Sequence, residues 1–186
     1  MSELRGPVFA KQDYAGFPRR MLALLVDFLL MHAVLAAALT SYVISTYLSS
    51  GIPEEPDARV MFWLCGAWLV FAVTYNFVFR LFENGTLGYR LIGIRYAYML
   101  NGRPDKFWVV TRSLWAVFLT GFFALNHLWI LFDPNKQAWH DKLGGFYVVK
   151  KSARPIGEQR VNRGYIGFLG YNFIVWEPAA HGSAKP

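Results

Sequence analysis

The chain has 186 residues, of which 55% are hydrophobic and 18% aromatic, and its formal net charge is +7. The hydrophobic residues gather in three long runs with short polar connections, a pattern that the core of a soluble protein does not need. The basic residues stand beside the ends of these runs, where orientation signals belong, so we expect no nucleic-acid partner. The single cysteine, Cys65, excludes an intrachain disulfide and a thiolate metal site.

Residues 1–18 contain prolines and two basic residues but little periodic apolar content, so we expect an extended or interfacial arm. Residues 21–48 form the first apolar run, directly after Arg20. Because about 20 residues of helix cross the hydrocarbon, this run predicts an uncleaved transmembrane helix, too long for the apolar part of a signal sequence.

Asp27 lies well inside the first run, where a carboxylate needs a specific partner. Arg20 precedes it by seven residues, so the two side chains share a helix face with about 10 Å between them along the axis. An arginine side chain extends over part of that distance, which makes Arg20 a candidate partner. Taken alone, Arg20 is more typical of an interfacial anchor at the start of a helix.

Residues 61–82 form the second run, after an acidic connection that we expect outside the cell. Arg80 stands near its end, so this span should run from outside to inside. Tyr75 and Asn76 fall at a depth similar to that of Asp27, and we predict that one of them hydrogen-bonds this carboxylate.

Residues 86–93 suit a short amphipathic helix on the membrane surface with Arg90 among the headgroups, the alternative being a polar loop. Residues 94–98 have the composition of a strand and precede a turn signal at residues 101–102. Their best partner is residues 146–150. The sequence therefore predicts a two-stranded cap on the inner membrane face.

Residues 107–132 form a third apolar run. A single crossing would place the many basic residues that follow outside, against the usual tendency, and two crossings need more residues. Gly121 and the pair Asn126-His127 interrupt the run, which favours a broken or re-entrant helix that returns inward. We expect Asp133 to be a surface acid at its end.

The order and spacing of these features resemble the RDD family of small membrane proteins, which is named for an arginine at the start of the first helix, an aspartate within it and a second aspartate downstream. Arg20 and Asp27 match the first two. The second falls at Asp141, within Gln-Ala-Trp-His-Asp-Lys-Leu-Gly-Gly at residues 137–145, with Asp133 as the alternative. One departure is visible, since the family usually has Gly-Thr where this chain continues with Gly-Phe.

His140 and Asp141 invite a catalytic interpretation in which the aspartate orients the imidazole as a general base. No nucleophile elbow, metal-spaced histidine pair or phosphate loop accompanies them in the sequence. We therefore expect an interfacial helix start in which Asp141 pairs with Lys142 or Arg90. No catalytic residue, metal or cofactor is predicted.

From residue 151 the composition changes, and residues 164–170 repeat glycine every third position with aromatic or aliphatic residues between. A tail this aromatic should not stay free in water, so we expect it to pack on a partner protein. The candidate contacts are Tyr165, Phe168, Tyr171, Phe173 and Trp176.

The predicted fold class is an all-α polytopic membrane protein. It would have two full spans, a third helix that is broken or re-entrant, interfacial helices and the small strand pair. The chain divides into the arm (1–18), a membrane domain (19–150) and the tail (151–186). We expect it in the bacterial inner membrane with a cytoplasmic amino terminus.

Two functions compete. The resemblance implies transport of ions or small solutes, with Arg20, Asp27 and Asp141 carrying the charge. A transporter normally encloses its site between repeats or bundles, and with about three membrane segments and no evident repeat this chain would do so only as an oligomer. We favour a non-catalytic accessory or assembly subunit that contacts the lipid bilayer and other membrane subunits or copies of itself.

Overall fold

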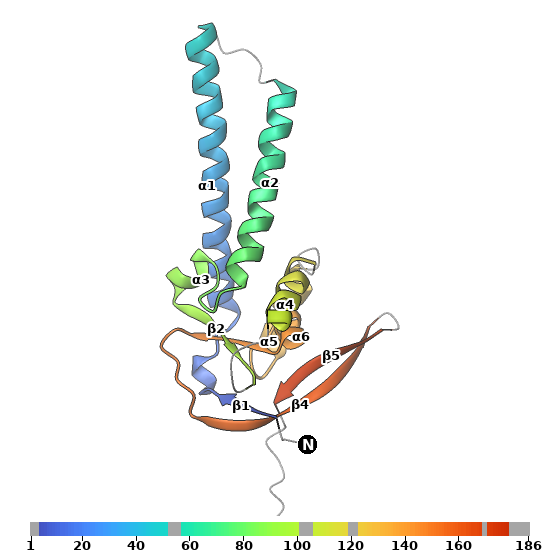
Figure 1. The fold of residues 1–186 in the computed structure, drawn as a ribbon. Helices are drawn as coiled ribbons and strands as arrows, with labels where there is room; N and C mark the ends of the chain where they lie inside the picture. The colour runs from blue at the N-terminus through green and yellow to red at the C-terminus, as the bar shows by residue number, and fades with distance from the viewer. Residues whose placement is uncertain (1–3, 52–56, 101–105, 119–122, 169–170, 179–186) are drawn as a thin grey trace, which may run out of the picture.

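Two long antiparallel helices stand side by side and project from a broader head (Figure 1). The computed structural model describes residues 4–51, 57–100, 106–118, 123–168 and 171–178. The long helices are α1 (Phe17–Ser50) and α2 (Ala58–Arg80), and the head contains the remaining elements. The predicted turn at residues 101–102 and Gly121 lie outside the described residues.

The ends of α1 and α2 follow ordinary capping chemistry. Pro18 stands in the first turn of α1, where its missing N–H costs nothing, and Gly51 ends this helix by donating its N–H to the Tyr47 carbonyl. The Asp57 side chain accepts a hydrogen bond from the Arg59 N–H at the start of α2. With 34 and 23 residues, the helices extend about 51 and 35 Å, and both are long enough to cross about 30 Å of hydrocarbon.

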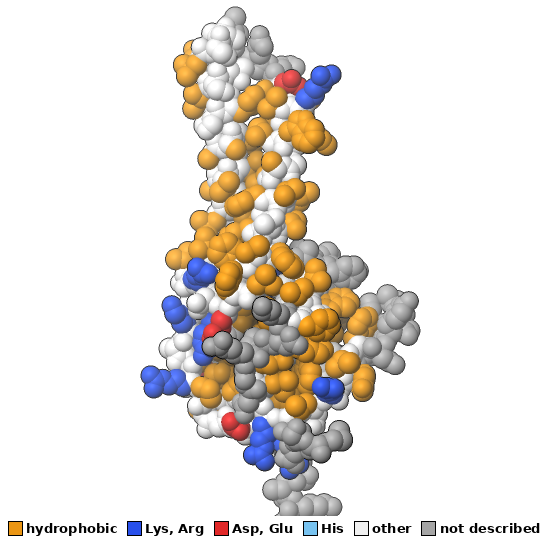
Figure 2. Space-filling view, in the orientation of Figure 1, with side chains coloured by type: hydrophobic (Ala, Val, Ile, Leu, Met, Phe, Trp, Pro, Cys, Tyr) orange, Lys and Arg blue, Asp and Glu red, His pale blue; other side chains and the backbone are white. Residues whose placement is uncertain are grey.

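The side chains along α1 and α2 are apolar and mostly exposed. Leu25 is 51% exposed, Phe62 70% and Trp63 71%. Figure 2 shows hydrophobic side chains along this column, with Lys and Arg gathered around the head and at the far end. A core helix of a soluble protein would bury such residues, so lipid is the solvent that fits this surface.

The head contains two similar units that pair with each other. Helix α3 (Leu87–Ile92) leads through Gly93 into strand β2 (Ile94–Tyr98), and helix α6 (Trp139–Gly144) leads through Gly145 into strand β3 (Phe146–Lys150). Both glycines have φ of 70°, a conformation that ends a helix and that other residues adopt only with strain. Strands β2 and β3 pair antiparallel, Ile94 opposite Lys150, which confirms the predicted pair and reveals an internal repeat that the sequence had not shown.

The third apolar run is divided between two helices, α4 (Lys106–Phe118) and α5 (Phe123–Phe132). Their 13 and 10 residues extend roughly 20 and 15 Å, too little for either to cross the hydrocarbon. Both contact α6 within the head. Among the described residues there is thus no third spanning helix and no single re-entrant one.

The arm and the tail form a second sheet. Strands β1 (Arg5–Val8), β4 (Gly157–Phe168) and β5 (Tyr171–Pro178) pair antiparallel in the order β1-β4-β5, and a short 3-10 helix (Lys11–Asp13) follows β1. The predicted all-α class is therefore wrong. The glycine-rich and aromatic composition of the tail does not favour a helix. Val161 and Val175 are buried and supply the apolar contacts that stabilise the β4–β5 hairpin.

Strand β3 lies at the centre of the head because both of its faces are covered. Tyr147 and Val149 belong to a core cluster that includes Trp176 of the tail. Phe146 and Val148 point to the other side and belong to a cluster that includes Ala23 of α1. This alternation joins the tail hairpin, the strand pair and the base of the first long helix.

Candidate functional site

Asp27 is the centre of the first buried polar cluster, which joins three helices. Its carboxylate is 1% exposed and accepts hydrogen bonds from the Tyr75 hydroxyl at 2.7 Å, the Thr86 hydroxyl at 2.5 Å and the Gly88 N–H at 2.8 Å. Of the two residues predicted to reach this carboxylate, Tyr75 does so. Asn76 instead donates to the Ala72 carbonyl within its own helix.

These contacts also complete the start of α3, where backbone N–H groups have no partner within the helix. The Leu87 N–H donates to the Tyr75 hydroxyl at 3.0 Å, and the Gly88 N–H donates to Asp27. The negative carboxylate therefore lies where the partial positive charge of a helix start favours it. A Cβ on Gly88 would overlap the Ala23 carbonyl oxygen, so glycine is what permits α3 to approach α1 this closely.

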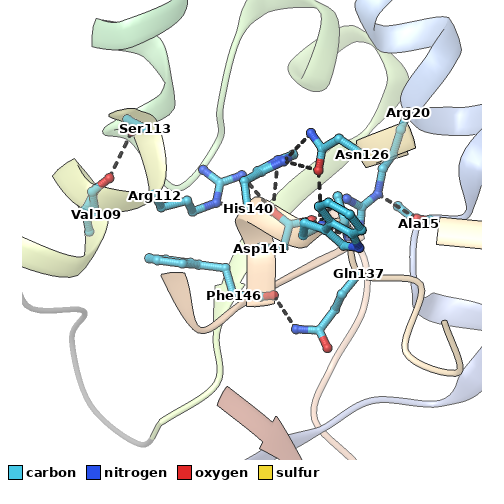
Figure 3. Close-up of polar contacts among 12 residues, drawn as sticks. Ala15, Arg20, Val109, Arg112, Ser113, Asn126, Gln137, His140, Asp141 and Phe146 are labelled. Atoms are coloured by element: carbon cyan, nitrogen blue, oxygen red, sulfur yellow. Dashed lines mark hydrogen bonds and ion pairs between the residues drawn. The ribbon is translucent and has the colours of Figure 1, made fainter. Parts of the chain in front are cut away.

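Asp141 is the centre of the second cluster, in which one carboxylate pairs with two arginines (Figure 3). The Arg20 guanidinium donates to Asp141 Oδ2 and to the Lys136 carbonyl, and its Nε donates to the Ala15 carbonyl at 2.9 Å. Arg112 donates to Asp141 Oδ1 from its terminal nitrogen at 3.1 Å. The three charged side chains are 0–1% exposed.

Arg112 was not singled out from the sequence, although it completes the cluster. Its guanidinium carbon lies 3.7 Å from the centre of the Tyr96 ring, and its Cβ would lie 2.6 Å from a Cβ added to Gly144. The available signal was an arginine inside an apolar run, which in a membrane protein indicates a buried partner. One carboxylate neutralises only one of the two arginines. The face of the Tyr96 ring attracts the Arg112 guanidinium and so helps to stabilise the remaining positive charge.

His140 is held within the same cluster. Its Nδ1 lies 2.9 Å from the nitrogen and 3.2 Å from the oxygen of the Asn126 side-chain amide, and its Nε2 lies 3.4 Å from Asp141 Oδ1. Asn126 in turn accepts a hydrogen bond from the Trp139 N–H. Both imidazole nitrogens thus face partners inside a buried network, and His140 is only 2% exposed. This arrangement holds the ring in place.

The charges of the cluster determine its protonation. Burial alone raises the pKa of the Asp141 carboxyl, but its interactions with the nearby His140, Arg20 and Arg112 side chains outweigh burial and hold this pKa well below its usual range. Burial lowers the pKa of the His140 imidazole well below its usual value. At neutral pH the imidazole is therefore uncharged, and the two arginines supply the positive charge that balances Asp141.

The predicted pairing of Arg20 with Asp27 is wrong. The two residues belong to separate clusters, since Asp27 takes neutral donors and Arg20 takes Asp141. The physical reason is proximity. Gly88 lets α3 reach the carboxylate directly, whereas an arginine would have to extend about two turns along its own helix.

The predicted partners of Asp141 and the predicted place of Asp133 are also corrected. The Lys142 ammonium lies 3.2 Å from Asp133, and Asp133 is buried, not at the surface. Arg90 is exposed and lies over the Phe79 ring. Asp141 is the aspartate that contacts Arg20.

The tail residues divide into buried and exposed ones. Trp176 is 1% exposed and packs edge-on against Trp108, which corrects its prediction as a partner contact. The Phe173 ring lies 5.3 Å from that of Trp115, also within the chain. Tyr165 remains 68% exposed. The side chains of Phe168 and Tyr171 lie outside the described set.

Two exposed apolar helices, joined to a polar head by buried charge clusters, define a small integral membrane protein. The family model of the RDD family matches residues 14–145. The chain belongs to the RDD family, whose members are membrane proteins. The match contains Arg20, Asp27 and Asp141 and ends before the β4–β5 hairpin. The comparisons with curated proteins and with solved structures gave no match.

Proposed function

We propose that this protein is a non-catalytic accessory or assembly subunit of a larger membrane complex. The internal pairing of its buried charges is the observation that carries the proposal. Asp27 and Asp141 both take their hydrogen bonds from side chains and backbone of the same chain. A carboxylate that couples transport must exchange its proton or ion with water, and these two carboxylates instead hold helices together.

The surface of α1 offers a place for a partner helix. Small residues recur every fourth position on one exposed face, which permits close approach of a second membrane helix. These residues are Ala33, Ala37, Ser41 and Ser45. The Ser41 hydroxyl is already bonded to the carbonyl of Ala37, so this face carries little unsatisfied polarity.

The orientation follows from the distribution of charge. The head carries most of the basic residues, and we propose that it lies in the cytoplasm of a bacterial cell, with the amino terminus, against the inner membrane. Helices α4 and α5 would then lie on the membrane surface. Phe107, Leu131 and Phe132 are 64%, 49% and 76% exposed, which suits contact with the outer part of the bilayer.

The test is native mass spectrometry of the full chain after mild extraction from its own membrane. We expect a complex of higher mass, which Ala37→Leu disrupts because the larger side chain separates the helices. Ala36→Leu is the matched control, since Ala36 is exposed on a different face of the same helix.

The competing transport function is tested on the same preparation. Ion flux into proteoliposomes is compared between the native chain and Asp27→Asn. A protein that purifies alone, folds normally as Asp27→Asn and loses a measurable flux on that change would overturn the proposal and make Asp27 a coupling site.

A further inference from the structure

A pocket of about 330 Å³ lies where the end of α2 meets the strand pair. This volume is at the lower end of the range for small-molecule sites. Its wall combines three charged residues with apolar side chains from β1, β2 and α4. The charged residues are Arg80, Glu83 and Arg95.

The two arginines of the pocket differ in their bonding. Arg95 is 2.5 Å from Glu83 in an ion pair and also donates to the Ala153 carbonyl. The Nε of Arg80 is buried and finds no hydrogen-bond acceptor among the described residues. A buried donor without a partner costs free energy, and an anionic oxygen in the pocket would remove that cost.

The position of the pocket at the membrane boundary indicates which kind of anion it could bind. Arg80 is the last residue of α2, so it stands where the hydrocarbon gives way to the headgroups. Leu81 and Phe82, which follow it along the pocket wall, are 36% and 55% exposed. An anion with an apolar body matches this wall better than a free ion does.

We propose that this pocket binds the phosphate of an anionic phospholipid, with Arg80 as its principal donor. Arg80, Arg95 and Glu83 together carry one positive charge, which complements the single negative charge of a phosphodiester. Basic pockets beside membrane helices are a known means of holding such headgroups. The proposal depends on the membrane location of the chain and not on its function as a subunit.

The experiment is native mass spectrometry of the full chain in detergent with phosphatidylglycerol, phosphatidylcholine or free glycerol phosphate. The variants are Arg80→Gln, Arg80→Lys and, as matched control, Arg19→Gln, an exposed arginine at the head end of α1. Thermal unfolding of each variant verifies that it is folded.

We expect the native chain to retain phosphatidylglycerol at least tenfold better than phosphatidylcholine, and Arg80→Gln to lose this preference. Arg80→Lys keeps the charge without the Nε donor and should retain part of it, while Arg19→Gln should behave like the native chain. Equal retention of phosphatidylglycerol and phosphatidylcholine by the native chain would refute a specific lipid site at Arg80. An equal loss of the phosphatidylglycerol preference in Arg80→Gln and Arg19→Gln would also refute it. If the chain binds glycerol phosphate tightly but shows no preference for phosphatidylglycerol, the pocket is a site for a soluble phosphate and the proposal of a lipid ligand is wrong.

Discussion

Arg20 at the start of α1 forms an ion pair with Asp141 of α6, although 121 residues separate them in the chain. Arg112 of α4 bonds the other carboxylate oxygen. One buried carboxylate therefore joins the first membrane helix to two helices of the head. The stability of that joint can be measured directly.

Replacing Asp141 with Asn should destabilise the protein by about 3–5 kcal/mol, because two buried guanidinium groups would lose the carboxylate that they share. Thermal or denaturant unfolding in detergent measures this loss. Asp13→Asn is the matched control, because Asp13 pairs with Lys150 at a partly exposed site and should cost less than about 1 kcal/mol. Similar losses in the two variants would show that Asp141 is not a structural joint.

Replacing Gly88 with Ala should lower the free energy of unfolding by at least about 1–3 kcal/mol. The added Cβ would overlap the Ala23 carbonyl and force α3 away from α1. Gly66→Ala is the control. A Cβ at Gly66 meets no atom within 4 Å, so that change should be neutral or slightly stabilising in the interior of α2. A Gly88→Ala protein as stable as the native one would contradict the close packing of these helices.

Replacing Tyr75 with Phe removes one hydrogen bond to Asp27 and the acceptor of the Leu87 N–H. We expect a loss of about 1–3 kcal/mol and faster amide exchange at Leu87, because the start of α3 loses a partner. A double-mutant cycle with Asp27→Asn should show coupling of the two residues. Additive effects would mean that their contact contributes little to stability.

Stability should fall as the pH is lowered below about 6.5 because of His140. Its pKa is lowered in the folded chain, so the unfolded chain takes up the proton first and each further pH unit costs up to about 1.4 kcal/mol. Asp141, whose folded pKa is also low, adds stability that is lost only in stronger acid, below its ordinary pKa of about 4.

Unfolding of the native chain and of His140→Gln between pH 5 and 8 separates these effects. Above pH 5, the free energy of unfolding should change less steeply with pH in His140→Gln than in the native chain. If the free energy of unfolding of His140→Gln depends on pH as steeply as that of the native chain, His140 is not the cause of the pH dependence. His32→Gln, on α1 and outside the cluster, is the control.

Local patterns in the sequence predicted the elements that depend on neighbouring residues. Apolar runs of sufficient length indicated α1 and α2, and strand composition indicated the pairing of β2 with β3. The interruptions in the third run indicated a broken or re-entrant helix, but only the structure showed that the run is divided between α4 and α5, two short helices that both contact α6. The sheet formed by β1, β4 and β5 was missed because the pairing of the arm with the tail joins opposite ends of the chain.

The sequence by itself determined that this is a membrane protein of the RDD family and that the carboxylate of Asp27 requires a partner. Only the tertiary structure decided that Arg20 pairs with Asp141, that Arg112 joins them and that Asp27 takes neutral donors. The reason is physical. Burial and hydrogen-bond geometry select the partner of a buried charge, and both exist only once the ends of distant helices have come together.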